Sequence, residues 1–445
     1  MKVAFINPKG TLFSKNPELS QFLRNTTAMD SFRHFWSAPC LGLLAIAAYL
    51  PEDWEAVYID ENYRAINFEE SFDFVCISAM TVQAERAYAL AEVYRRKNLL
   101  TVIGGIHATI LPEEAGKHFD VVLAGEGEVV FPAFIQDYLK GKVKKIYKET
   151  QPGKFDLRRC IVPRYDLLKG YEYPVINLYT TRGCPRKCSF CCASNVYGTK
   201  YRRKTNEQII CEIDMISARF PDKMILFADD NLFVLRQQSR QLLKLMLSKH
   251  IRWIAQTDIS IADDEDLLKR MYQAGCQWVV IGFESVSEKS LKQVESRDFK
   301  NRYIHSYSEK IKKIQSAGIR VYGTFIVGLD EDEGRIFDDT ADFILENHLY
   351  GANITVPTPL PGTALRQGLE SENRIRSRNW ADYTLWDVVI QPKKITAAEL
   401  ENGLLHVYKR INEKNRADER LRYIFQEMKR GLYGDRDRKK YNSYI

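Results

Sequence analysis

Short apolar runs alternate with segments of helical periodicity over the first 140 residues. Each run is apolar on both faces and is followed by glycine, proline or polar residues, which is typical of parallel strands covered by helices. The pattern predicts an α/β domain of five parallel strands, doubly wound in flavodoxin-like (Rossmann-type) order. The expected strands are Lys2–Asn7, Glu55–Asp60, Phe72–Ser78, Leu100–Gly104 and Val121–Gly125, and the expected helices are Leu41–Leu50, Val82–Lys97 and Val129–Leu139.

A second alternation of apolar runs and helical segments begins near residue 175. Its six β/α units predict a partial (β/α)6 barrel of the TIM type, whose functional face lies at the carboxyl ends of the strands. The expected strands are Val175–Thr180, Lys223–Ala228, Trp253–Thr257, Trp278–Phe283, Val321–Val327 and Ala352–Val356. The expected helices are Asn206–Arg219, Arg236–Ser248, Glu265–Ala274, Ile304–Ala317 and Ile336–Glu346.

The pattern changes again from Pro359 and becomes mostly helical. We therefore expect four segments in a chain of 445 residues, of which 45% are hydrophobic and can form substantial cores. They are a Rossmann-like domain over 1–142, a linker over 143–174, the barrel over 175–358 and a helical C-terminal extension over 359–445.

The net charge of +7 is concentrated at the C-terminal end, since Lys409–Ile445 contains 12 Lys and Arg but 6 Asp and Glu. One interpretation is a solvated helix with a polar tail. The other is contact with an anionic membrane surface, which we favour over nucleic acid. The longest apolar stretch, Pro39–Leu50, is too short to span a bilayer, and Met1–Phe5 resembles a strand rather than a secretory signal. We expect a cytoplasmic protein, with peripheral membrane contact as the alternative.

Four of the nine cysteines lie within Cys184–Cys192. Cys184, Cys188 and Cys191 form a CxxxCxxC motif directly after the first barrel strand. An iron–sulfur cubane normally takes four Cys ligands, so three leave one iron open for a small molecule. Structural zinc is the competing interpretation, but it needs four ligands in a closed site, and neither His107 nor Cys192 has suitable spacing for the fourth.

The cysteine motif, with Phe190 before its third cysteine, resembles that of the radical S-adenosylmethionine (SAM) superfamily, and the similarity covers about Val175–Val356. It implies a [4Fe–4S] cluster held by Cys184, Cys188 and Cys191, with Cys192 a neighbour only. In that family the amino and carboxylate groups of SAM chelate the open iron. An electron from the cluster then cleaves SAM to a 5′-deoxyadenosyl radical, which abstracts hydrogen.

Three other strand ends of the barrel match positions that contact SAM in this family. The acids after the second strand stand where the family binds the SAM ammonium, although they could instead cap the next helix. The fourth strand ends in a second polar candidate, and the fifth carries glycines that would let the backbone approach the adenine. The candidate SAM residues are Asp229, Asp230, Glu284, Ser285, Gly323, Ile326 and Gly328.

The strand ends of the first domain carry glycines and polar residues, which suit a large flat ligand at the carboxyl edge of a doubly wound sheet. Their Gly-Gly-Ile-His-Ala-Thr and Gly-Glu-Gly-Glu runs resemble the cobalamin-binding domain of cobalamin-dependent radical SAM enzymes. No Asp-x-His-x-x-Gly motif is present, which argues against a His ligand to cobalt. FMN, a nucleotide or a vestigial domain that only shapes the substrate cavity are the alternatives. The candidate cobalamin residues are Ser78, Thr81, Gly104, Gly105, His107, Thr109, Gly125, Glu126, Gly127 and Glu128.

The C-terminal segment, with Trp380, Trp386 and the Pro357–Thr363 turn, resembles that of cobalamin radical SAM proteins that act on lipids, including hopanoid C-2 methylases. Its aromatic residues could also simply pack a lid. The resemblances imply a cobalamin-dependent radical SAM enzyme that transfers a methyl group to an unactivated carbon of a small-molecule or lipid substrate. They also imply an external electron donor such as flavodoxin or ferredoxin.

Two other functions remain as alternatives, and a third is disfavoured. Within the same class, the enzyme could catalyse a radical rearrangement, cyclisation or C–C coupling without net methylation. Outside it, the chain could be a non-catalytic cobalamin or redox sensor. A methylthiotransferase is disfavoured because the N-terminal domain lacks a second cysteine triad. The sequence leaves the catalytic residues unknown.

Overall fold

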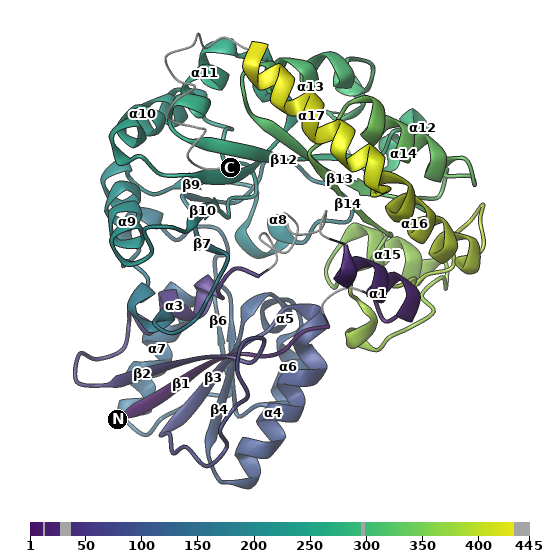
Figure 1. The fold of residues 1–445 in the computed structure, drawn as a ribbon. Coiled ribbons are helices and arrows are strands. Elements are labelled where there is room, and N and C mark those ends of the chain that lie inside the picture. Colours follow the sequence, from purple (N-terminus) through teal and green to yellow (C-terminus); the bar gives the residue numbers. More distant parts are fainter. Residues whose placement is uncertain (12–13, 27–36, 295–298, 431–445) are drawn as a thin grey trace. The chain divides into compact units, whose positions relative to one another are not determined.

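The computed structural model describes residues 1–11, 14–26, 37–294 and 299–430, which form two compact units (Figure 1). The first unit contains Met1–Ser20, Ser37–Pro221 and Thr358–Gln391. The second contains Asp222–Pro357, residues 21–26 and the described residues from Pro392 on. The segment predicted as a C-terminal extension, residues 359–445, thus contributes to both units.

The first unit is built on a parallel sheet in the order β2-β1-β3-β4-β5-β6. The first five strands confirm the predicted flavodoxin-like order, and each agrees with its predicted bounds to within two residues. The sixth strand lies in the stretch predicted as a linker, where three residues carry too little apolar signal to be recognised. The strands are β1 (Lys2–Asn7), β2 (Glu55–Asp60), β3 (Phe74–Ser78), β4 (Leu100–Gly104), β5 (Val121–Ala124) and β6 (Ile146–Lys148).

Helices cover both faces of this sheet (Figure 1). On one face α3 (Leu41–Ala47) packs with α7 (Gly127–Leu139), and on the other α4 (Ala84–Arg96) packs with α6 (Pro112–His118). Most residues of β1, β3, β4 and β5 are therefore buried, which explains why these runs are apolar on both faces. The same unit contains α1 (Pro17–Asn25, whose last residues belong to the second unit), α5 (Gly105–Ile110), α8 (Ala193–Tyr197) and α9 (Asn206–Arg219).

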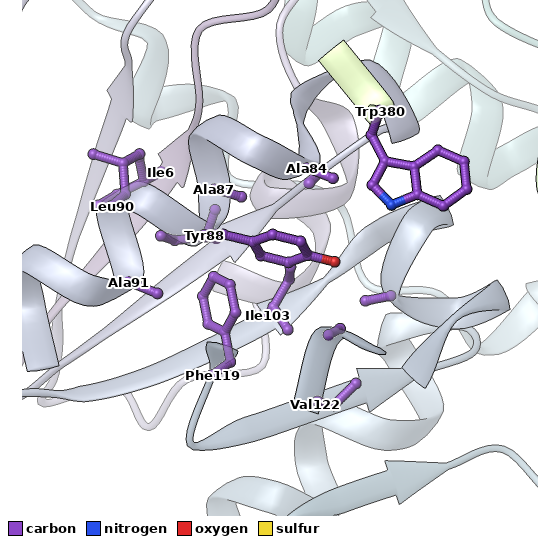
Figure 2. Packing of buried hydrophobic residues seen from close by; sticks show 14 of the residues in the cluster. Ile6, Ala84, Ala87, Tyr88, Leu90, Ala91, Ile103, Phe119, Val122 and Trp380 are labelled. Atoms are coloured by element: carbon purple, nitrogen blue, oxygen red, sulfur yellow. The ribbon is translucent and has the colours of Figure 1, made fainter. Parts of the chain in front are cut away.

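Residues 358–391 complete the core of the first unit, although they follow the last barrel strand in sequence. Leu369 and Ile390 are buried in one apolar cluster with Ile6 and Ile77 of the sheet. Trp380 belongs to this cluster too, and Figure 2 shows it on the side to which the Tyr88 hydroxyl points. The segment comprises α15 (Ala364–Ser371), a 3-10 turn (Trp380–Asp382) and a bridge between Ile375 and Ile390.

The second sheet has six strands in the order β14-β13-β12-β11-β10-β7, and its strands β10 to β14 are parallel. With a helix between successive strands, it confirms the predicted partial barrel. The strands are β7 (Val175–Leu178), β10 (Met224–Phe227), β11 (Trp253–Thr257), β12 (Cys276–Glu284), β13 (Arg320–Ile326) and β14 (Gly351–Thr355).

The second unit's chain from Pro392 on is helical, as predicted, in α16 (Ala397–Ile411) and α17 (Lys414–Arg430). Gly403 lets α16 pack closely on α14, because a side chain there would overlap the ring of Phe337. Among the described residues, no helix is long and apolar enough to cross a membrane. The barrel helices are α10 (Arg236–Met246), α11 (Glu265–Gln273), α12 (Glu288–Val294), α13 (Tyr307–Ser316) and α14 (Ile336–Glu346). Further 3-10 turns are Thr81–Gln83, Leu157–Arg159, Tyr165–Leu168, Leu247–Lys249, Ile259–Asp263 and Asn301–Ser306.

Candidate cofactor sites

The cysteine motif lies in an irregular loop of the first unit, between β8 (Thr181–Arg182) and α8. β8 pairs with β9 (Arg202–Arg203), so the loop leaves and returns at one narrow base. Gly183 has a φ of +88°, and a side chain there would overlap the Lys200 carbonyl. The Cys191 amide donates to the Cys188 carbonyl at 3.2 Å, which folds these two cysteines into one turn.

Cys184, Cys188 and Cys191 are all half-buried, as is Cys192. Within the described ranges, no three His, Cys, Asp or Glu side chains are grouped so that they could hold a metal ion as they stand. The donor set nevertheless fits a cluster with one open iron, because three thiols of one loop are partly accessible to solvent. The assignment of these three as ligands remains a prediction.

Buried ion pairs tie the base of this loop to the turn that follows β5. Arg182 donates to Glu126 at 2.7 Å and to Glu128 at 2.5 Å. Arg202 donates to the second oxygen of Glu126 at 2.6 Å. The four side chains are between 0 and 9% exposed. Glu126 and Glu128, predicted as cobalamin contacts, are thus engaged by arginines on either side of the cysteine motif.

The ion pairs keep Glu128 ionised despite its burial. Burial alone would raise the pKa of Glu128, but the charge and hydrogen bonds of Arg182 outweigh it and lower the pKa to about 2. The Tyr179 hydroxyl adds a hydrogen bond to Glu128 at 2.9 Å. At neutral pH this is a fixed pair of opposite charges.

The other predicted cobalamin residues gather at the carboxyl edge of the first sheet. Ser78 and Gly104 end neighbouring strands and are paired in register. Gly105 has a φ of +92°, and a β-carbon there would lie 2.8 Å from the Ala79 carbonyl oxygen. Thr109 donates to the Gly105 carbonyl and accepts from the Gly125 amide, at 2.8 and 3.1 Å.

Close contacts within the protein also account for the other glycines of this edge. Gly125 has a φ of +128° and leaves no room for a side chain beside Glu149. Gly127 packs against Ile46 in the same way, and Thr81 is buried in the turn after β3.

His107 lies on α5, directly after β4, and its side chain is buried. Its Nε2 atom is 2.8 Å from the Tyr88 hydroxyl and 3.5 Å from Glu114. Burial lowers the pKa of His107 although Glu114 opposes the shift, so the ring is neutral. Trp380 donates to the same Glu114 oxygen at 2.6 Å. Tyr88 and Glu114 thus hold one ring nitrogen of His107, and its contact with cobalamin stays a prediction.

In the second unit, Asp229 and Asp230 follow β10 as predicted. Asp229 is buried, whereas the side chain of Asp230 is exposed. Surrounding protein atoms, and then the carboxylate of Asp229, raise the pKa of Asp230 to about 6. A cation such as an ammonium group would relieve the repulsion between the two acids.

Glu284 ends β12 in a strained conformation, with a φ of +64°. The Lys300 ammonium donates to it at 2.7 Å and to the Gly282 carbonyl at 2.5 Å. Gly282 has no room for a side chain beneath this pair. Ser285 is buried, and its hydroxyl accepts from the Ser287 amide at 3.1 Å. Of the two predicted SAM contacts at the end of β12, Glu284 is thus the one with a charged side chain.

The predicted adenine-side positions on β13 are packed inside the second unit. A β-carbon on Gly323 would lie 2.6 Å from the Phe325 ring. Ile326 is buried. Gly328, with a φ of +93°, lies against Leu400 of α16. Gly323 lies within β13, Ile326 ends the strand and Gly328 follows it, and both glycines also have packing reasons to be glycine.

Both halves of the chain match known protein families. Residues 178–344 match the radical SAM superfamily, and residues 37–135 match the B12 binding domain, together more than half of the chain. The chain is a cobalamin-dependent radical SAM enzyme. Its cofactors are accordingly a [4Fe–4S] cluster, SAM and cobalamin, which confirms the three predicted.

Two curated relatives of this radical SAM enzyme are methyltransferases. It is 27% identical to bacteriochlorophyllide d C-12(1)-methyltransferase of Chlorobaculum tepidum over 83% of this chain and 82% of the relative. It is 26% identical to the hopanoid C-2 methylase of Rhodopseudomonas palustris over 80% of this chain and 70% of the relative.

A solved structure shares the fold of this radical SAM enzyme. The radical SAM methyltransferase TsrM from Kitasatospora setae, with cobalamin and a [4Fe–4S] cluster bound, superimposes with a TM-score of 0.62 at 16% identity. The match covers 91% of this chain and 85% of TsrM.

The sequence patterns did not identify Arg182, Arg202 and Lys300 of this enzyme. Arg182 stands two residues before Cys184, so its place beside the motif was the available signal. Lys300 lies far from Glu284 in sequence, and no spacing rule joins them.

Proposed function

We propose that this enzyme transfers a methyl group to an unactivated carbon of a small-molecule or lipid substrate. The observation that carries the proposal is that the cysteine loop and the flavodoxin-like sheet belong to one compact unit. An enzyme that joins radical formation to methyl transfer needs both cofactors in one protein. When bound, SAM at the cluster would supply a 5′-deoxyadenosyl radical, and reduced cobalamin would take a methyl group from a second SAM and pass it to the substrate.

The chain's own residues would bind and orient these groups. Cys184, Cys188 and Cys191 would hold the cluster, and Asp229 with Asp230 would pair with the ammonium of SAM. The glycine-rich edge at Gly104–Gly105 and Gly125 would admit the cobalamin ring to the backbone. None of these roles requires a general acid or base.

A large apolar acceptor is the substrate class that the relatives support. Their names place methylation on a bacteriochlorophyllide and on a hopanoid. A rearrangement, cyclisation or C–C coupling remains the alternative outcome, and isotopic labelling of the SAM methyl group separates it from methylation.

The test uses full-length protein reconstituted anaerobically with iron, sulfide and hydroxocobalamin. We expect about four irons bound per chain, 5′-deoxyadenosine after reduction, and one cobalamin. C184A, C188A and C191A should each lose the cluster and SAM cleavage. C211A, at an exposed cysteine, is the matched control and should lose neither.

SAM with a deuterated methyl group, incubated with an extract of lipids and pigments, then reports the outcome by mass spectrometry. A product heavier by one labelled methyl supports the proposal. A product without label, formed with 5′-deoxyadenosine, supports the non-methylating alternative. Absence of both 5′-deoxyadenosine and a labelled product would contradict enzymatic function altogether and favour a sensor.

Two partners belong to this proposal. An external flavodoxin or ferredoxin would reduce the cluster, and an anionic membrane would present a lipid acceptor. The densest basic cluster, Arg436, Arg438, Lys439 and Lys440, lies outside the described residues. Each well-placed basic residue would add roughly 1 kcal/mol of membrane affinity, so changing all four to Gln should weaken binding to phosphatidylserine vesicles. Unchanged vesicle binding would favour a soluble acceptor.

A further inference from the structure

Arg182 and Arg202 lie on either side of the cysteine loop in the sequence. Their side chains pair with glutamates of the same buried turn, the one that follows β5. We propose that Glu126 and Glu128 are positioning residues for the iron–sulfur cluster. They hold Arg182 and Arg202, and through them both ends of the loop that carries Cys184–Cys191. In this role they replace the cobalamin contacts that the Gly-Glu-Gly-Glu resemblance implies.

The two arginines define the base of the loop. Arg182 and Arg202 are directly opposite one another where β8 pairs with β9. Arg202 also donates to the Tyr197 carbonyl at 2.9 Å and to the Phe155 carbonyl at 2.9 Å. Tyr197 is the last residue of α8, the helix that follows the motif. One guanidinium therefore secures the chain before the motif, and the other secures the helix after it.

Each carboxylate oxygen of the two glutamates already accepts at least one hydrogen bond from an arginine. One oxygen of Glu126 accepts from Arg182 and the other from Arg202. Both oxygens of Glu128 accept from Arg182, and one of them also accepts from the Tyr179 hydroxyl. Their side chains are 0 and 4% exposed. Burial, together with these bonds, leaves the two carboxylates little surface for a cofactor to contact.

The chemistry of the pairs favours a rigid clamp. A guanidinium presents its donors in a planar fork, so pairing with two carboxylates fixes its orientation as well as its position. The ring of Tyr179 lies 4.2 Å from the Arg182 guanidinium and limits its movement further. The charges of these two arginines and two glutamates cancel one another.

The test compares E126Q, E128Q and R182K with E212Q in the full-length enzyme. Glu212 is an equally buried carboxylate of the same unit, and it pairs with Lys204 at 2.6 Å and accepts from the Tyr165 hydroxyl at 3.4 Å. Each protein is reconstituted, and bound iron is followed over time with a chelator present. Hydroxocobalamin affinity and the EPR line shape of the reduced cluster are measured on the same samples.

For E126Q and E128Q we expect chelator-driven iron loss to be faster by on the order of tenfold, as for other residues that orient metal ligands. Their EPR line shape should change while hydroxocobalamin affinity stays that of the wild type. R182K keeps the charge but loses the fork, so its iron loss should fall between the wild type and E128Q.

Two results would overturn the proposal. One is weaker hydroxocobalamin binding by E126Q or E128Q with normal iron retention, which would return the glutamates to the cobalamin site. The other is equal iron loss in E212Q, which would mean that any buried carboxylate of this unit destabilises the cluster. Neither readout depends on methyl transfer, so failure of the proposed reaction would leave this test intact.

Discussion

At the carboxyl edge of the first sheet, Glu128 is buried among arginine donors, whereas in the second unit Asp230 follows its strand beside another acid. The pKa of Glu128 falls to about 2 because Arg182 outweighs burial. The pKa of Asp230 rises to about 6 because its surroundings and Asp229 disfavour the charge. Acidic residues after a parallel strand thus serve two purposes, one structural and one suited to a cationic ligand.

Lowering the pH should therefore have opposite effects on the contributions of Glu128 and Asp230 to folding stability. The ionised form of Glu128 is favoured by folding, so its contribution to stability is complete above about pH 4.3 and is lost as the pH falls toward about 2. The neutral form of Asp230 is favoured by folding, so its contribution is complete below about pH 4 and is lost as the pH rises through about 6.

The largest expected effect comes from removing the positive charge at the first edge. R182Q leaves Glu128 buried without its main partner, which should cost about 3–5 kcal/mol of unfolding free energy. Chemical denaturation at pH 7 measures it. R158Q removes an exposed partner of Asp156 at 2.7 Å and should leave the denaturation midpoint where it is. Equal shifts in the two variants would remove the distinction between the buried cluster and ordinary surface pairs.

The backbone of the same edge should be the next most sensitive feature. G125A combines a positive φ with overlap against Glu149 and should cost about 3 kcal/mol. G141A has a φ of +66° but open space around it, so about 1 kcal/mol is expected. G125A should also weaken hydroxocobalamin binding, while G141A should not. If the two variants behave alike, backbone approach is not what this edge provides.

Glu114 offers an intermediate case, because neutral donors satisfy it instead of arginines. W380F removes the indole donor at 2.6 Å and should cost about 1 kcal/mol, since the carboxylate is partly exposed and water can replace the bond. Y383F removes a hydroxyl that donates to the Ser377 carbonyl at 2.8 Å and is the matched control. If W380F lowered the unfolding free energy as much as R182Q does, burial and not charge pairing would determine the size of the loss.

The smallest stability effect, of opposite sign, is expected at the second edge. D230N removes repulsion from Asp229, and because the side chain is exposed the gain above pH 6 should stay below about 1 kcal/mol. The rise in stability on acidification from pH 6 to 4 should shrink with it. SAM affinity should fall by on the order of tenfold. A variant that is less stable at pH 8, with normal SAM binding, would assign Asp230 to helix capping.

Local pattern predicted the strands well because each is a buried run bounded by turn residues, as in Trp253–Thr257, whose bounds agree with the prediction. It also placed the cysteine motif and the Asp pair, since their positions follow from the strands before them. The local pattern could not predict which side chains pair when they lie far apart in the sequence. Nothing near Glu128 in sequence indicates Arg182, and the glycines at Gly323 and Gly328 fit packing as well as ligand approach.

The return of residues 358–391 to the first unit has a consequence for biosynthesis. Leu369, Val389 and Ile390 fill the same core as the N-terminal strands. A ribosome must therefore add about 240 residues after β6 before that core can close, which takes roughly 12 to 48 s at about 5–20 residues per second. During this time the nascent N-terminal unit exposes an apolar face. The first unit should consequently reach its native state only after residues 358–391 have emerged, although its sheet emerges first.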